Sequence, residues 1–188
     1  MNTVRLAILC SGQAGQRRDM LEDLLSDPDL DIAIVRRPDE QVLAGPADAI
    51  DRFLADPAAA QPNLVRLTIS TPSHSRYLAA AGDSFRAVLA VSSLTAPRIP
   101  VLASVDATRV RTREQALEAL SRQIATTVRW DRCMDALAEA GINAAIELGP
   151  GNDLARLIEK EHPRIAARSI GEFRNVHSVA DWLATCGE

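Results

Sequence analysis

The second half of the chain alternates between short apolar runs and segments whose apolar positions have helical spacing. Strands are predicted at three short apolar runs: Ile99–Ser104, Ala144–Leu148 and Ile165–Ser169. Helices are predicted at four segments: Arg76–Ala90, Asp131–Ala140, Asp153–Lys160 and Val179–Ala184. The capping-box pattern Thr112-Arg113-Glu114-Gln115 predicts the start of a further helix, which reaches about Gln123. This alternation favours an α/β fold with a mainly parallel sheet.

The N-terminal segment has the pattern of a buried strand that leads into a loop and a helix. The apolar run Val4–Cys10 is followed at once by the stretch Ser11–Gln16, and a helix is predicted at Asp19–Leu25. Gly12 and Gly15 allow a tight turn that brings backbone N–H groups close to an oxyanion. The loop lacks the third glycine of a dinucleotide fingerprint and the Gly-Lys-Ser/Thr of a phosphate-binding loop. A plain connection between strand and helix fits this pattern equally well.

The interval between residues 32 and 70 has a different pattern, with short elements joined by short turns. Its predicted elements are two strands, a helix and a strand: Ile32–Val35, Gln41–Ala44, Ala47–Ala55 and Leu64–Ser70. This order suits a small α+β lobe inserted into a larger α/β unit. We therefore predict that residues 1–31 and 71–188 form the larger domain and that residues 32–70 form the lobe.

Composition narrows the class of protein. Apolar residues make up 47% and charged residues 24% of the chain, as in soluble globular proteins. A net charge of −4 argues against a broad nucleic-acid surface. No apolar run approaches the roughly 20 residues of a membrane span. The three cysteines stand far apart, which favours a reducing compartment. We expect a cytoplasmic protein without nucleic-acid or membrane partners.

His74 is the candidate general base. It follows a predicted strand, lies between two serines and comes after Pro72, which restricts the loop. Histidine suits proton transfer because its ordinary pKa lies near working pH. The local context by itself fits a polar loop histidine better than a base. His162 and His177 are expected at the surface, and no histidine pair has the spacing of metal ligands.

A histidine base needs a nucleophile, and the chain offers no good candidate. The nearest match to the nucleophile elbow G-x-S-x-G is the stretch around Ser84, which lacks the second glycine. It also falls within a predicted helix, so we interpret Ser84 as structural. None of the three cysteines, Cys10, Cys133 and Cys186, follows a nucleophile pattern either.

Four separated motifs resemble those of malonyl-CoA:acyl carrier protein transacylases. In chain order they are the loop Leu9–Gln16, the stretch from Pro38 through Val42-Leu43-Ala44-Gly45, the segment Pro72-Ser73-His74-Ser75, and the pair Val128-Arg129-Trp130 and Ile146-Glu147-Leu148-Gly149-Pro150-Gly151. The family forms are P-G-Q-G-S-Q, P-x-Q-x-V-I-A-G, P-S-H-S/C, and V-x-W with E-x-G-P-G. Each motif is weak alone, but their shared order makes the resemblance specific.

This resemblance implies an α/β-hydrolase-like domain with an inserted ferredoxin-like lobe. It implies an acyltransferase whose serine takes the malonyl group from malonyl-CoA and passes it to the phosphopantetheine thiol of an acyl carrier protein. No permanently bound cofactor or metal is implied. By resemblance His74 is the base, Gln13 offers a backbone N–H to the oxyanion, and Gln123 orients the histidine.

Within the family, Ser11 stands where the fatty-acid enzymes have proline. That difference resembles the malonate decarboxylase branch, whose epsilon subunit loads a dedicated carrier protein of the malonate decarboxylase complex. The transacylase of fatty-acid or polyketide synthesis is the alternative.

The chain departs from the family pattern before Ile32. There the family carries the nucleophilic serine, its helix and the arginine that pairs with the malonyl carboxylate, whereas only Ser26–Asp31 spans the interval here. We expect the sequence to be an incomplete version of a longer protein, with a stretch missing near residues 29–31. Smaller departures are Arg36, where the family tends to have asparagine, and Glu40, which replaces glutamine.

Two other classes of function stay open. A shortened relative without activity would bind a carrier protein and transfer nothing, and this applies if the polypeptide is truly 188 residues long. An unrelated α/β hydrolase would require a reactive serine, for which Ser84 is the test.

Overall fold

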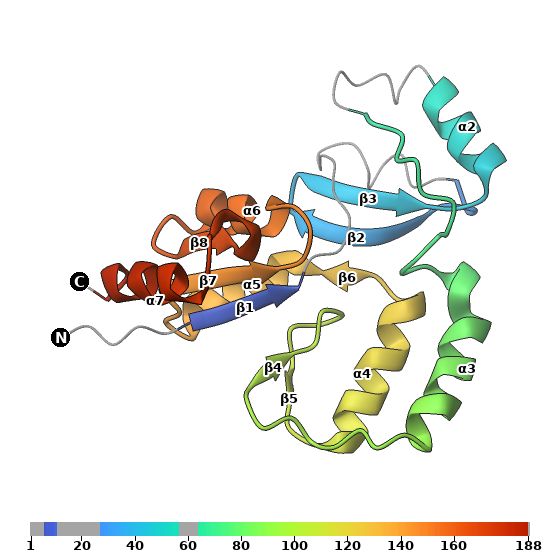
Figure 1. Cartoon of the computed structure of the whole chain (residues 1–188). Coiled ribbons are helices and arrows are strands. Elements are labelled where there is room, and N and C mark those ends of the chain that lie inside the picture. The colour runs from blue at the N-terminus through green and yellow to red at the C-terminus, as the bar shows by residue number, and fades with distance from the viewer. Residues whose placement is uncertain (1–5, 11–26, 57–63, 188) are drawn as a thin grey trace. The chain divides into compact units, whose positions relative to one another are not determined.

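The computed structural model describes residues 6–10, 27–56 and 64–187 (Figure 1). The predicted loop Ser11–Gln16, with Gln13, and the predicted helix Asp19–Leu25 therefore lie outside the described residues. The chain forms two compact units: residues 1–14 with 134–188, here the C-terminal unit, and residues 15–133, here the central unit. This division differs from the predicted lobe of residues 32–70, and the lobe boundaries stay a prediction.

The C-terminal unit is built on a parallel sheet, as the alternation of strands and helices predicts. Its strands are β1 (Leu6–Cys10), β7 (Ala144–Leu148) and β8 (Ala166–Ser169), in the order β1-β7-β8. Figure 1 shows the arrows of β1 and β7 side by side and in one direction. The first four residues of β7 are buried, as expected for the central strand of a parallel sheet.

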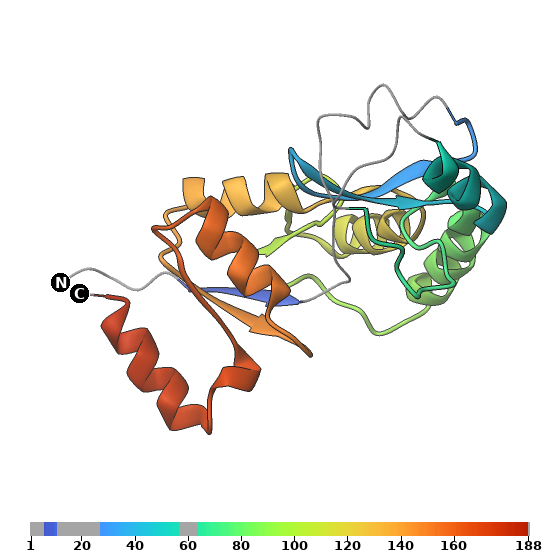
Figure 2. The same ribbon diagram turned by 90° about the horizontal axis from the view of Figure 1, so that it is seen from above.

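The helices of this unit pack through apolar positions. The helix α6 (Asp153–Glu161) buries Leu154, Ala155, Leu157 and Ile158, which share one face at helical spacing. The short helix η3 (Ile170–Glu172) is followed by α7 (Val176–Thr185), and the Phe173 and Trp182 rings contact each other with centroids 5.6 Å apart. The strand β8 lies between α6 and α7 (Figure 2).

In the central unit, β2 (Asp31–Arg37) and β3 (Glu40–Ala44) form an antiparallel hairpin. The third strand of this sheet is β6 (Val128–Arg129), which pairs parallel with β2. The predicted strand Leu64–Ser70 is wrong: these residues form no strand, and Val65 is 65% exposed. Apolar alternation gives a strand only where a neighbouring strand pairs with it, and the described structure pairs no strand with these residues.

The motif Val128-Arg129-Trp130 thereby gains a structural explanation. Val128 belongs to the buried cluster that joins β2, β3 and β6, and Trp130 packs against that cluster. Arg36 and Glu40, the two departures from the family pattern in this hairpin, form an ion pair with Nη1 and Oε1 2.5 Å apart.

The remaining elements of the central unit are helices and a small hairpin. They are α2 (Ala47–Ala55), η2 (Arg76–Leu78), α3 (Ala79–Ala90), β4 (Val101–Leu102), β5 (Arg109–Val110) and α4 (Arg113–Ala125). The helices α3 and α4 pack side by side (Figure 1). The capping box of Thr112 and Gln115 is present at the start of α4, as predicted. The helix α5 (Trp130–Glu139) runs from the central unit into the C-terminal unit.

Candidate active site

The His74 loop connects the extended segment that ends at Thr71 to η2, and its backbone has an unusual conformation. His74 has a φ of 62°, in the left-handed region that residues with a side chain rarely adopt. Such a conformation costs on the order of 1 kcal/mol or more and persists only where surrounding contacts determine it. Contacts around His74 must therefore hold the residue in this conformation.

The C-terminal turn of α4 holds His74 at two points. The backbone N–H of His74 donates to the carbonyl oxygen of Ile124 at 2.9 Å, and its ring Nδ1 contacts the carbonyl oxygen of Gln123. The last carbonyls of a helix have no partner within the helix, so they are available as acceptors. His74 thus satisfies two of the free carbonyls of α4.

This contact fixes the tautomer of a neutral His74 ring. A carbonyl oxygen only accepts, so Nδ1 must carry the proton and Nε2 becomes the acceptor. Among the described residues no group is bonded to Nε2. The positive charge that the ring gains on accepting a proton would lie at a helix C-terminus, where the helix dipole favours cations. The arrangement suits proton acceptance at Nε2.

Gln123, predicted to orient the histidine, does lie against His74, through its backbone carbonyl. Its side-chain Oε1 accepts from the Ser104 hydroxyl at 3.0 Å, and the Ser104 carbonyl accepts from the Arg129 N–H at 2.6 Å. The side chain therefore ties the end of α4 to the segment after β4. Gln13, the predicted oxyanion donor, lies outside the described residues.

Two serines and a cysteine of the described residues make contacts, or have surroundings, that do not suit a nucleophile. Ser75 is 1% exposed and donates to the carbonyl of Pro72 at 2.6 Å. Ser84 is exposed on α3, and its hydroxyl donates to the Ala80 carbonyl of the same helix at 2.9 Å. Burial raises the pKa of the Cys133 thiol to about 12, so it stays protonated and unreactive at neutral pH.

The Glu147–Gly151 motif lies at the carboxyl end of β7, in the C-terminal unit. Glu147 is fully buried, and its Oε2 accepts from the N–H of Ala155, in the first turn of α6, at 2.9 Å. No donor in the described part of the chain reaches its Oε1. Gly149 and Gly151 have φ values of 148° and 93°, which favour glycine.

The two histidines expected at the surface have different surroundings. His162 lies 3.4 Å from an Asp135 carboxylate oxygen, and His177 is exposed on α7. Across residues 6–10, 27–56 and 64–187, no group of acidic, histidine or cysteine side chains is arranged to hold a metal ion. In the same ranges no helix is long and apolar enough to cross a bilayer.

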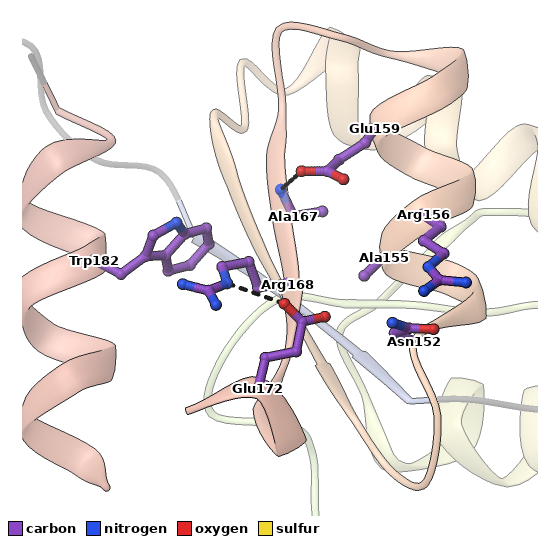
Figure 3. Close-up of a pocket in the computed structure, with 8 residues that line it drawn as sticks. All are labelled: Asn152, Ala155, Arg156, Glu159, Ala167, Arg168, Glu172 and Trp182. Atoms are coloured by element: carbon purple, nitrogen blue, oxygen red, sulfur yellow. Dashed lines mark hydrogen bonds and ion pairs between the residues drawn. The ribbon is translucent and has the colours of Figure 1, made fainter. Parts of the chain in front are cut away.

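A shallow hollow of about 420 Å³ in the C-terminal unit contains none of the predicted site residues (Figure 3). Its charged groups have partners: Arg168 pairs with Glu172 at 3.1 Å, and Glu159 accepts from the Ala167 N–H at 3.4 Å. Because Glu172 also accepts from the Ser169 N–H, the two glutamates occupy outward-facing donors of the edge strand β8. The hollow therefore borders a sheet edge whose free N–H donors are occupied by the two glutamates.

Comparison with known proteins identifies the family. A profile of the acyl transferase domain matches residues 6–178. This chain belongs to the acyl transferase domain family. It is 28% identical over 142 residues to a malonyl CoA-acyl carrier protein transacylase of Synechocystis, covering 76% of this chain and 48% of that protein. It is 35% identical over 159 residues to the polyketide biosynthesis protein ThaF of Burkholderia thailandensis, covering 82% of this chain and 13% of that protein.

Solved structures agree with this family membership. The crystal structure of malonyl-CoA:acyl carrier protein transacylase from Xanthomonas oryzae superposes with a TM-score of 0.79 at 27% identity, covering 93% of this chain and 57% of that one. The α/β fold is thus confirmed. The chain spans about half the length of the curated transacylases it matches.

Sequence reasoning missed two residues that contact the His74 loop, Asp31 and Arg76. Asp31 accepts from the backbone N–H and from Nε of Arg76, each at 2.8 Å. No local pattern could have shown this contact, because the two residues are 45 positions apart.

Proposed function

We propose that His74 is the general base of an acyltransferase that moves a malonyl group from malonyl-CoA to the phosphopantetheine thiol of an acyl carrier protein. One observation carries the proposal: in a member of the acyl transferase family, the His74 ring is held through Nδ1, which leaves Nε2 to accept a proton. The names of the curated relatives supply malonyl-CoA and the carrier protein as substrates.

In the proposed reaction, His74 Nε2 accepts a proton and gives it up once in each of two halves. In the first half, a serine hydroxyl gives its proton to Nε2 and attacks the thioester carbonyl of malonyl-CoA, and the departing thiolate takes that proton. In the second half, the phosphopantetheine thiol gives its proton to Nε2 and attacks the serine ester. The serine then recovers its proton, and the backbone N–H of Gln13 donates to the oxyanion in both halves.

We propose that the serine and the malonyl-binding arginine belong to a longer form of the protein, in a stretch between the first predicted helix and β2. The support is that the chain spans about half of its curated relatives and that only Ser26–Asp31 occupies this interval. In the longer form we propose a hydrolase-like domain, of which residues 1–31 and 71–188 are a part, with a ferredoxin-like lobe that includes residues 32–70.

We further propose that this acyltransferase serves a malonate decarboxylase complex, and Ser11 supports this assignment. The alternative is a transacylase of fatty-acid or polyketide synthesis. Transfer of malonyl from malonyl-CoA to the holo carrier subunit of malonate decarboxylase and to a fatty-acid carrier protein should be measured side by side. We expect the decarboxylase carrier to be loaded faster, and faster loading of the fatty-acid carrier would replace this assignment.

Replacing His74 tests the proposal itself. In the longer form, His74→Ala should slow malonyl transfer by a factor of about 10² to 10⁴, the usual contribution of a general base. His177→Ala, on the exposed side of α7, is the matched control and should transfer at the unchanged rate. A His74→Ala protein that keeps the original rate would refute the role.

A shortened carrier-binding protein is the second candidate, and the junction after residue 26 favours it. Arg52 pairs with Asp27 at 3.2 Å and with Asp29 at 2.9 Å, and Leu30, which follows them, is 4% exposed. The short connection therefore fits the central unit well. The intact mass of the protein from its native source decides: 20.3 kDa favours this candidate, and a larger mass favours the longer form.

A further inference from the structure

The His74 loop is held from a second side, by the first residue of β2. The Asp31 carboxylate accepts from the backbone N–H of Arg76 at 2.8 Å through Oδ2 and from Arg76 Nε at 2.8 Å through Oδ1. Arg76 Nη2 also contacts Asp31 Oδ1 and lies 3.4 Å from the carbonyl oxygen of Leu30. Three of these four bonds end on one carboxylate, so Asp31 anchors the exit of the loop.

Asp31 takes the place of a capping residue for η2. The residue before η2 is Ser75, whose hydroxyl is turned back to Pro72 and makes no capping bond. The first N–H of η2 would then lack an acceptor, and Asp31, 45 positions earlier in the chain, supplies it. The loop is consequently fixed at its exit by β2 and at its centre by α4.

We propose that Asp31 is a positioning residue for His74, which keeps the left-handed backbone of His74 in place and thereby the ring Nδ1 on the Gln123 carbonyl. The proposal rests on the proposed role of His74 as the base. Arg76 is the residue through which Asp31 acts.

The physical reason lies in the short distance along the chain. Only Ser75 separates His74 from Arg76, so a free Arg76 would allow His74 to relax toward negative φ. That rotation would carry the ring away from the α4 carbonyls. Asp31 stays ionised over the range in which a histidine base works, because the hydrogen bond from the Arg76 side chain lowers its pKa below the usual 3.8.

The test reads the ring directly, on the full chain. The chain holds three histidines, so ¹⁵N ring spectra are assigned by replacing each one with glutamine. The wild type should show His74 as the Nδ1–H tautomer. A second readout is the rate at which diethyl pyrocarbonate modifies each histidine, measured by mass spectrometry of peptides.

Four variants separate positioning from general stability. Asp31→Ala removes the acceptor, and Arg76→Ala removes the side-chain bonds but keeps the backbone one. Asp31→Asn keeps a neutral acceptor for the Arg76 N–H. Glu118→Ala is the matched control, because it breaks an exposed ion pair with Arg86 between α3 and α4 that does not touch the loop.

We expect Asp31→Ala to give a mixture of His74 tautomers and a several-fold faster modification of His74, with the rate at His177 unchanged. Asp31→Asn should lie closer to the wild type. Glu118→Ala should lower the melting temperature without changing either His74 readout. An Asp31→Ala protein whose His74 tautomer and rate match the wild type would overturn the proposal.

If Asp31→Ala fails to fold, Arg76→Ala decides by the same readouts: partial tautomer mixing supports the proposal, and a wild-type pattern overturns it. These measurements need no catalysis. They therefore remain decisive even if His74→Ala retains malonyl transfer, which would refute the proposed function alone.

Discussion

Two turns of this chain carry family motifs and depend on left-handed backbone, and they reach it by different means. In the Glu147–Gly151 turn, glycines occupy the positions with φ of 148° and 93°. In the His74 loop, a histidine has a φ of 62°, and contacts from α4 and β2 hold it there. A motif of glycines carries its conformation in the local sequence, whereas the conformation of the His74 loop depends on residues far along the chain.

Glu147 should show the largest effect, since one buried carboxylate links β7 to α6. Glu147→Ala removes the acceptor of the Ala155 N–H and leaves a cavity, so the free energy of unfolding should fall by about 3 kcal/mol. Glu147→Gln keeps an oxygen for Ala155 and should cost about 1 kcal/mol or less. Urea denaturation of both variants measures this, and equal losses would contradict the assigned contact.

Gly151→Ala tests whether the turn depends on glycine alone. A Cβ at this position would meet no atom within 4 Å, so the only cost is conformational. We expect a loss of about 1 kcal/mol in the free energy of unfolding, measured by the same denaturation. A neutral or stabilising Gly151→Ala would show that the turn relaxes freely.

At position 74, glycine should give a more stable protein than alanine, which reverses the usual order of stability of these two residues. Both His74→Ala and His74→Gly lose the contact with Gln123, but only alanine keeps the cost of a positive φ. His74→Gly should therefore be the more stable of the two by about 1 kcal/mol. Thermal unfolding of the pair checks this, and a more stable His74→Ala would mean that the contacts do not enforce the left-handed backbone.

The contact between Asp31 and Arg76 should give the smallest effect on the free energy of unfolding, and this effect should disappear in acid. Because the folded pKa of Asp31 lies below its ordinary 3.8, its contribution to stability is fully present above that value and is lost as the pH falls through the lower folded pKa. In the Asp31→Asn variant, the free energy of unfolding should therefore change less with pH over this acidic range. Denaturation midpoints of the wild type and the variant, measured from about pH 5 down to about pH 2, give this pH dependence. The same pH dependence in both proteins would contradict the pairing of Asp31 with Arg76.

The sequence was sufficient where a feature is local. The helix Ala47–Ala55 has the predicted bounds, and the Thr112 capping box forms as its pattern indicates. The strand Ala144–Leu148 is confirmed with its predicted bounds, and its first four residues are buried, as suits a central parallel strand. Leu64–Ser70 fails because strand pairing depends on a distant partner.

The candidate site shows the same contrast between features set by the local sequence and features set by distant residues. The Pro72-Ser73-His74-Ser75 pattern located the histidine, and the resemblance pointed to Gln123. Which atom of Gln123 contacts the ring could not be predicted, because it depends on where α4 ends. Asp31 could not be found at all, because its role follows from how β2 meets η2.

The identity of the acylated residue tests the central claim most directly, namely that His74 is one half of a catalytic pair whose nucleophile this chain does not hold. The longer form would be incubated with isotope-labelled malonyl-CoA, quenched in acid, digested and mapped by mass spectrometry. We expect a malonyl ester on a serine in the stretch between residues 26 and 31 that only the longer form contains. A malonyl group on Ser84, or on any other residue of the present sequence, would contradict it.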